Sequence, residues 1–141
     1  MITSNIVNGK TVFEIDEEIC KKMLLLAHEA LVNTYPKSGA GYAVSLLTKK
    51  GTLYQGVSYG SDTATLTMHS EATALANAAI HGDRDIIAIT GPNCHICKQL
   101  IYESSLRSGI DTVIIIQEGE KILQVPISTL MPYPWPEKLL S

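Results

Sequence analysis

The chain is poor in the residues that mark secreted, membrane-bound and nucleic-acid-binding proteins. Of its 141 residues only three are cysteine, 18% are charged and 6% are aromatic, and the formal net charge is −3. Three cysteines cannot build a disulfide framework, so we expect a reducing, cytoplasmic location. Lys and Arg form no extended run, and we expect no nucleic-acid partner, because phosphate binding needs a basic face.

Long apolar segments are also absent. The longest unbroken runs, residues 23–27 and 113–116, are far shorter than the roughly 20 residues of a transmembrane helix. The N-terminal segment shows no basic region followed by an apolar block, so neither a membrane span nor a secretion signal is predicted. Hydrophobic residues nevertheless make up 45% of the chain, enough for one core, and we expect a single domain over residues 1–141.

The order of the predicted elements indicates an α/β fold. Hydrophobic periodicity and turn residues together place helices and strands along the chain. Helices are expected from Asp16 and over residues 69–80 and 94–108, and strands over residues 42–48, 52–59, 86–90, 111–117 and 121–125, after a lead-in hairpin at Asn8 and Gly9. Helices that cover both faces of one mixed β-sheet of about five strands make a three-layer α/β/α sandwich. The proline-rich segment at residues 131–136 is predicted to lie as a tail over a surface.

Four residues between positions 69 and 97 carry metal and proton chemistry. His69, Cys94 and Cys97 offer one imidazole and two thiols. A catalytic zinc keeps three protein ligands and leaves its fourth position open, whereas a structural zinc is closed by four. Glu71, two residues after the histidine, is a carboxylate free to move protons beside such an ion. The pattern therefore predicts an open Zn²⁺ site with Glu71 as its catalytic residue.

The expected secondary structure brings these ligands together. His69 and Glu71 fall where a loop becomes a helix, and Cys94 opens the next helix. Two helix N-termini therefore converge on one ion, and their free N–H groups favour thiolates there. Cys94 and Cys97 lie three residues apart and share a helix face. A redox role for this C-x-x-C pair is the alternative, but a thioredoxin-like motif belongs to a different order of elements.

Two motifs carry a family resemblance. H-S-E at residues 69–71 and P-N-C-H-I-C at residues 92–97 resemble the paired motifs of the zinc-dependent cytidine deaminase superfamily. The similarity to its small cytidine deaminases covers residues 16–141. It implies the cytidine deaminase fold, with Zn²⁺ held by His69, Cys94 and Cys97. It also implies that Glu71 carries protons between water, ring nitrogen and departing amine, and that the chain forms a homo-oligomer, a tetramer or a dimer.

The ligand set departs from that of the small cytidine deaminases in a consistent way. Those proteins carry Cys where this chain has His69, and Arg where it has Ala72. Three thiolates leave zinc with a negative shell that a nearby Arg offsets, whereas one neutral His and two thiolates need no such partner. The paired change therefore supports a working zinc site.

The residues expected around the substrate depart further. Members of the family bind the ribose of the substrate through an Asn and a Glu, which align with Ser58 and Gly60. The Phe that stacks on the pyrimidine ring in the family aligns with Ala40. Asn93 stands where the family has Pro directly before the first Cys. We therefore predict Ser58, Ala40 and Asn93 as substrate-binding residues of a pocket that differs in shape from that of the family.

The predicted function is a zinc-dependent hydrolytic deaminase that acts on a C–N bond in a cyclic amidine and releases ammonia. The resemblance implies cytidine, deoxycytidine or a related nucleoside as the small-molecule substrate, in pyrimidine salvage. A blasticidin S-like compound or a free base is an alternative substrate. A nucleic-acid deaminase with the same ligands, and a zinc-stabilised binding module in which Glu71 is idle, are the alternative functions.

Overall fold

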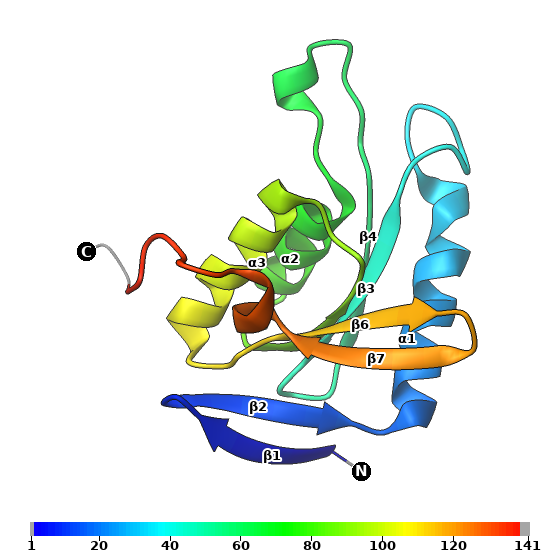
Figure 1. Ribbon diagram of the computed structural model, residues 1–141. Helices are drawn as coiled ribbons and strands as arrows, with labels where there is room; N and C mark the ends of the chain where they lie inside the picture. The colour runs from blue at the N-terminus through cyan, green and yellow to red at the C-terminus, as the bar shows by residue number, and fades with distance from the viewer. Residues whose placement is uncertain (1, 139–141) are drawn as a thin grey trace.

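The computed structural model describes residues 2–138 and shows two sheets and three α-helices in this range (Figure 1). The N-terminal hairpin consists of β1 (Ile2–Val7) and β2 (Lys10–Ile15). The helices and the strands of the larger sheet are, in chain order, α1 (Glu17–Ala30), β3 (Ala43–Thr48), β4 (Leu53–Val57), α2 (Ser70–Ile80), β5 (Ile86–Thr90), α3 (His95–Ser108), β6 (Val113–Glu118) and β7 (Lys121–Pro126). None of the described helices is both long enough and apolar enough to cross a bilayer.

The larger sheet is mixed, as the sequence predicts. Its strand order is β4-β3-β5-β6-β7; β5 and β6 run parallel, and the other described neighbours are antiparallel. The parallel pair needs a crossover connection, which α3 provides. Because β5 ends at Thr90, the chain leaves the carboxyl edge of this strand and turns directly into α3. This edge is where ligands commonly bind in open α/β sheets.

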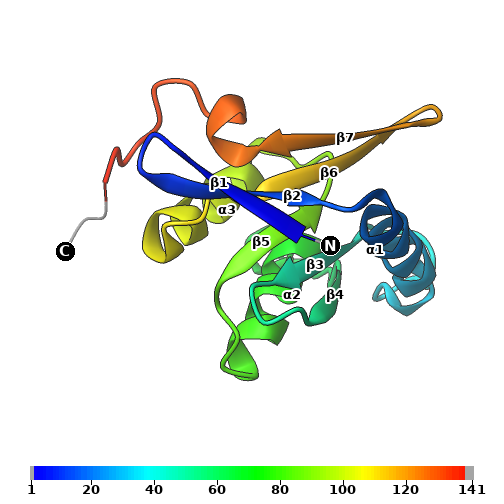
Figure 2. The ribbon, with the colours of Figure 1, turned by 90° about the horizontal axis from the view of Figure 1, so that it is seen from below.

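The helices cover both faces of the larger sheet (Figure 2). α1 lies on one face, and α2 and α3 lie on the other. Successive residues of a strand point to opposite faces, so β3 contributes to both layers. Leu46 packs in the buried cluster with α2 and α3, and Leu47 packs in the cluster with α1. The predicted three-layer α/β/α sandwich is therefore confirmed.

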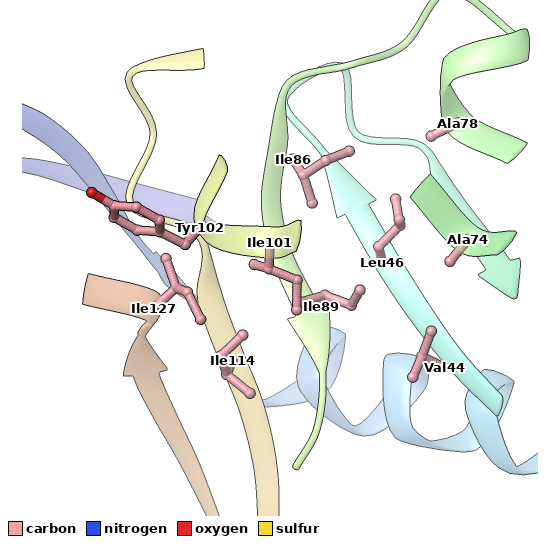
Figure 3. Close-up of a cluster of buried hydrophobic side chains, with 10 residues drawn as sticks. All are labelled: Val44, Leu46, Ala74, Ala78, Ile86, Ile89, Ile101, Tyr102, Ile114 and Ile127. Atoms are coloured by element: carbon pink, nitrogen blue, oxygen red, sulfur yellow. The ribbon is translucent and has the colours of Figure 1, made fainter. Parts of the chain in front are cut away.

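Small side chains let α2 approach the sheet closely. Ala74 and Ala78 are fully buried in the core cluster beside β3 (Figure 3). On the neighbouring strand β4, Gly56 directly contacts the first turns of α2: a Cβ atom there would lie 2.3 Å from the Ser70 carbonyl oxygen and 2.4 Å from the Ala74 nitrogen. This backbone contact sets the height of α2 above the sheet, and with it the position of Glu71 in the first helical turn.

Turns and element ends follow local sequence where no distant contact intervenes. The hairpin at Asn8 and Gly9 forms as expected, with both residues at positive φ (52° and 79°), as its tight turn requires. The strand expected from Asp111 instead begins at Val113. Asp111 is engaged elsewhere, because its carboxylate accepts hydrogen bonds from the Ser128 backbone N–H (3.0 Å) and the Ser128 hydroxyl (2.5 Å).

The proline-rich tail lies along α3 on the surface of the molecule, as predicted (Figure 1). Two hydrogen bonds attach it to this helix. The Gln99 side-chain amide donates to the Trp135 carbonyl oxygen (2.8 Å), and the Tyr102 hydroxyl donates to the Pro136 carbonyl oxygen (2.6 Å). The rings of Tyr133 and Trp135 stay exposed, whereas Met131 packs against the core cluster and Pro136 is buried.

Gly56→Ala should destabilise the protein, because the added methyl group has no space between β4 and the backbone of α2. Overpacking of this kind lowers the free energy of unfolding by about 1–3 kcal/mol. Chemical denaturation of the wild type and the variant measures the difference. An unchanged denaturation midpoint would contradict the direct packing of α2 on β4.

Candidate active site

Three metal-binding side chains meet at the N-termini of α2 and α3. His69 is the N-cap residue of α2, Cys94 is the N-cap residue of α3, and Cys97 lies in the first turn of α3. Their ligand atoms all lie within 4.8 Å of one another. His69 Nδ1 is 3.3 Å from Cys97 Sγ and 3.4 Å from Cys94 Sγ. The structure therefore brings together the three residues that the sequence predicts as ligands.

This donor set fits a zinc ion. Zinc prefers a tetrahedral shell with Zn–S bonds of about 2.3 Å and Zn–N bonds of about 2.0–2.1 Å, which places neighbouring ligand atoms roughly 3.5 Å apart. The nitrogen–sulfur distances in the cluster are close to that value. Within residues 2–138 no fourth His, Cys, Asp or Glu joins the group. The set therefore has the composition of a catalytic zinc site rather than of a closed structural one.

The two thiols of the cluster differ in environment. Cys94 is exposed, whereas Cys97 is only 2% exposed. Burial raises the pKa of the Cys97 thiol, and the nearby Glu71 carboxylate and Cys94 raise it further. Without a cation, Cys97 therefore holds its proton more firmly than an ordinary thiol does. A bound metal ion reverses this preference, because a coordinating thiol is deprotonated outright.

Glu71 is held in a defined orientation beside the cluster. It lies in the first turn of α2 and is 7% exposed. Its Oε1 accepts a hydrogen bond from the Ser70 hydroxyl (2.9 Å), and its Oε2 accepts one from the Asn93 side-chain amide (2.8 Å). An ionised carboxylate has about four lone-pair sites, so both oxygens keep acceptor capacity for a proton.

A cavity of about 750 Å³ opens over this site, within the range of about 300–1,000 Å³ typical of ligand pockets. His69, Glu71 and Cys94 line it. Ala40 and Ser58, which the sequence predicts as substrate-binding residues, line the same cavity. The loop segments before β3 and after β4 that carry them therefore line the same cavity as the ligand cluster, although their contact with a substrate stays a prediction.

Asn93 occupies a different place from the other two predicted substrate-binding residues. It is 8% exposed and is not among the residues that line the cavity. Its side-chain amide donates hydrogen bonds to Glu71 Oε2 (2.8 Å) and to the Thr90 carbonyl oxygen (3.1 Å). Contact of Asn93 with a substrate stays a prediction, whereas its contact with Glu71 is observed.

Aromatic side chains at the cavity were not identified from the sequence. Tyr35 and Tyr42 line it, and the Tyr35 ring stacks on the Tyr59 ring with centroids 4.6 Å apart. Tyr42 is 79% exposed. A tyrosine at the start of a predicted strand was the available signal, but only the fold shows that this strand end lies at the cavity.

The family model described as "Cytidine and deoxycytidylate deaminase zinc-binding region" matches residues 14–116. The chain belongs to this family. The matched segment contains His69, Glu71, Cys94 and Cys97. The resemblance drawn from the two motifs is therefore confirmed, and the cluster of one His and two Cys is the group typical of a zinc-binding deaminase site.

Solved cytidine deaminases share the fold of this family member. The cytidine deaminase from Burkholderia pseudomallei superposes with a TM-score of 0.66 at 18% identity, over 86% of this chain and 100% of its own. The Mycobacterium tuberculosis protein gives 0.66 at 16% identity (86% and 98%), and the Bacillus anthracis protein 0.61 at 17% (83% and 89%). At these identities the likeness shows the cytidine deaminase-like fold and not the substrate. No curated protein sequence matches the chain.

Cys97→Ala should abolish stoichiometric zinc binding, because it removes the buried ligand of the cluster. Elemental analysis after gel filtration should give one zinc per chain for the wild type and far less for the variant. Cys20→Ala is the matched control, since this buried thiol lies in the core cluster around α1 and should leave the zinc content unchanged. Equal zinc in the wild type and Cys97→Ala would contradict the assigned ligands.

Proposed function

We propose that the protein is a zinc-dependent hydrolytic deaminase of a small amino-heterocycle, with cytidine, deoxycytidine or a related nucleoside as the favoured substrate. The observation that carries the proposal is the position of Glu71, a buried residue that lines the same cavity as His69 and Cys94. Burial of a carboxylate is unfavourable unless the group is paired, and such groups concentrate at functional sites. Its place beside an open metal site supports a role in proton transfer.

The side chains of the site match the proton transfers that hydrolytic deamination requires. Zinc, when bound by the three ligands, supplies a water that is acidic near neutral pH. Glu71 accepts the first proton of the attacking water and delivers it to the ring nitrogen beside the reacting carbon. It then carries the second proton to the departing amine. The C–O bond forms in the first step and the C–N bond breaks in the second, so the amine and water become a carbonyl group and ammonia.

At the three aligned positions expected to contact the sugar and the ring of a substrate, the cavity lining offers one polar side chain. Ser58 offers a hydroxyl group, whereas Gly60 and Ala40 offer no polar side chain. Tyr35 and Tyr42 provide aromatic surface in the same cavity. A substrate ring can stack on such a surface even without the phenylalanine of the small cytidine deaminases. We therefore keep a blasticidin S-like compound and free bases among the substrates to be tested.

The zinc-loaded protein should release ammonia from at least one compound in a panel of cytidine, deoxycytidine, cytosine, blasticidin S, adenosine and guanine. Glu71→Gln should keep zinc and fold but lose about 100-fold or more in turnover, because an amide cannot carry the protons. A coupled ammonia assay follows the reaction.

Three outcomes of this assay would count against the proposal. Release that does not need Glu71 would remove its catalytic role. Silence across the panel with one zinc bound per chain would favour a zinc-stabilised binding module. Deamination of single-stranded DNA or RNA, with no activity on the small compounds, would favour a nucleic-acid deaminase.

We also propose that the protein is a cytoplasmic homo-oligomer, a tetramer or a dimer. Tyr35, Tyr42 and Tyr59 are each more than half exposed, and Met68 is 43% exposed. Backbone bridges join Tyr35 to Tyr59 and Tyr59 to Met68, so much of this apolar surface is continuous beside the cavity. Exposed apolar surface that is continuous marks an interaction site more often than scattered side chains do. A second copy of the chain would cover the part of this surface that lies outside the cavity and leave the cavity lining to the substrate.

Tyr42→Glu should shift the oligomer toward the 15.3 kDa monomer, because a charge is unfavourable in the buried part of an interface. Analytical ultracentrifugation at micromolar concentration measures the mass. Ile6→Glu, an equally drastic change of an exposed side chain on the N-terminal hairpin, serves as the control and should leave the mass unchanged. A monomeric wild type would overturn the proposed assembly.

A further inference from the structure

We propose that Asn93 is a positioning residue, which holds the Glu71 carboxylate in the orientation that proton transfer needs. The inference rests on the proposed function, because that function assigns Glu71 its part in the reaction. Asn93 itself is buried and does not line the cavity, so it acts through Glu71 rather than on the substrate. Its two hydrogen bonds, its unpaired oxygen and the space beside Gly91 support this role.

The hydrogen bonds define which way the Asn93 amide faces. Its nitrogen donates to Glu71 Oε2 (2.8 Å) and to the Thr90 carbonyl oxygen (3.1 Å). Both partners are acceptors, so the opposite orientation of the amide would place its oxygen against two oxygens and is excluded. Thr90 is the last residue of β5, a fully buried strand in the middle of the sheet. Asn93 therefore ties the carboxylate on α2 to the rigid centre of the sheet.

The oxygen of the same amide has no comparable partner. Asn93 Oδ1 is buried and accepts no hydrogen bond from any residue within 2–138. A buried acceptor without a partner is unfavourable. A side chain whose only task was packing would gain from an apolar replacement here. The amide is best explained by its NH₂ group, which neither a proline, as in the small cytidine deaminases, nor an apolar residue can replace.

The preceding turn provides the space that this arrangement needs. A Cβ atom at Gly91 would lie 2.7 Å from Asn93 Oδ1 and 2.5 Å from Ile114 Cγ2. Any larger residue at this position would therefore push the amide away from its observed place or displace β6. Glycine at position 91 and asparagine at position 93 form one local unit, which presents an N–H donor to Glu71.

Loss of this donor should affect the chemical step and not the binding of substrate. Ser70 would still hold Oε1, but Oε2 would lose its partner and the carboxylate could rotate away from the reacting atoms. A misplacement of this size can lower a rate by about 100-fold. Asn93→Asp keeps the shape of the side chain and replaces the donor by an oxygen, and Asn93→Ala removes the amide altogether.

Steady-state kinetics on the best substrate of the panel test the inference. We expect kcat to fall by about ten- to a hundredfold in both Asn93 variants, with KM within about twofold and zinc content unchanged. Asn77→Ala is the matched control and should leave kcat unchanged. The Asn77 side-chain amide, on α2, donates to the Gln55 carbonyl oxygen (3.1 Å) and to no other residue within 2–138. A folded, zinc-loaded Asn93 variant with wild-type kcat, or a change confined to KM, would overturn the role.

A second measurement does not depend on activity or on the folding of an Asn93 variant. The ¹⁵N spectra of the labelled wild type and of labelled Glu71→Gln are compared. The side-chain amide resonances of Asn93 should differ between the two proteins, whereas those of Asn77 should not. Unchanged Asn93 resonances would overturn the inference. If the wild type releases no ammonia from any compound, the proposed function fails, and the Asn93 resonances alone then decide whether the amide holds Glu71.

Discussion

The candidate site depends on how closely α2 packs against the sheet. α2 carries His69 at its N-cap and Glu71 in its first turn, whereas both thiols belong to α3. The contact of Gly56 with the backbone of α2 sets the position of His69 and Glu71. The short connection after β5 sets the position of the two thiols. Because both helices begin beside the same strand ends, their N-termini converge on one point. A shift of α2 by the width of a methyl group would separate the imidazole and the carboxylate from the thiols.

The groups at this point depend on one another electrostatically. Cys97 and Glu71 are both buried, and Glu71 contributes to the raised pKa of the thiol. A doubly charged cation relieves this conflict, since it favours the thiolate and the carboxylate together. Two thiolates and one neutral His69 would balance the charge of a zinc ion, so no further charged partner is needed beside the cluster.

Sequence reasoning could predict which three side chains meet, because residue type and spacing carry the chemistry of metal binding. The helices, strands and layers also follow from local periodicity and element order. The strand predicted from Asp111 begins later, because the Asp111 carboxylate accepts hydrogen bonds from Ser128, 17 residues further along the chain. The direction of the Asn93 amide could not be predicted, since the Thr90 carbonyl and the space beside Gly91 define it only in the folded chain. Tyr42 was missed for the same reason, as an aromatic side chain shows its use only beside a cavity.

His69, Cys94 and Cys97 form a candidate metal site with an open fourth position, next to the Glu71 carboxylate. X-ray absorption at the zinc edge of the purified protein tests it most directly. We expect one zinc per chain with two sulfur ligands at about 2.3 Å, one imidazole nitrogen at about 2.0–2.1 Å and one light-atom ligand that the protein does not supply. A shell closed by four protein ligands, or one without two sulfurs, would contradict the assignment.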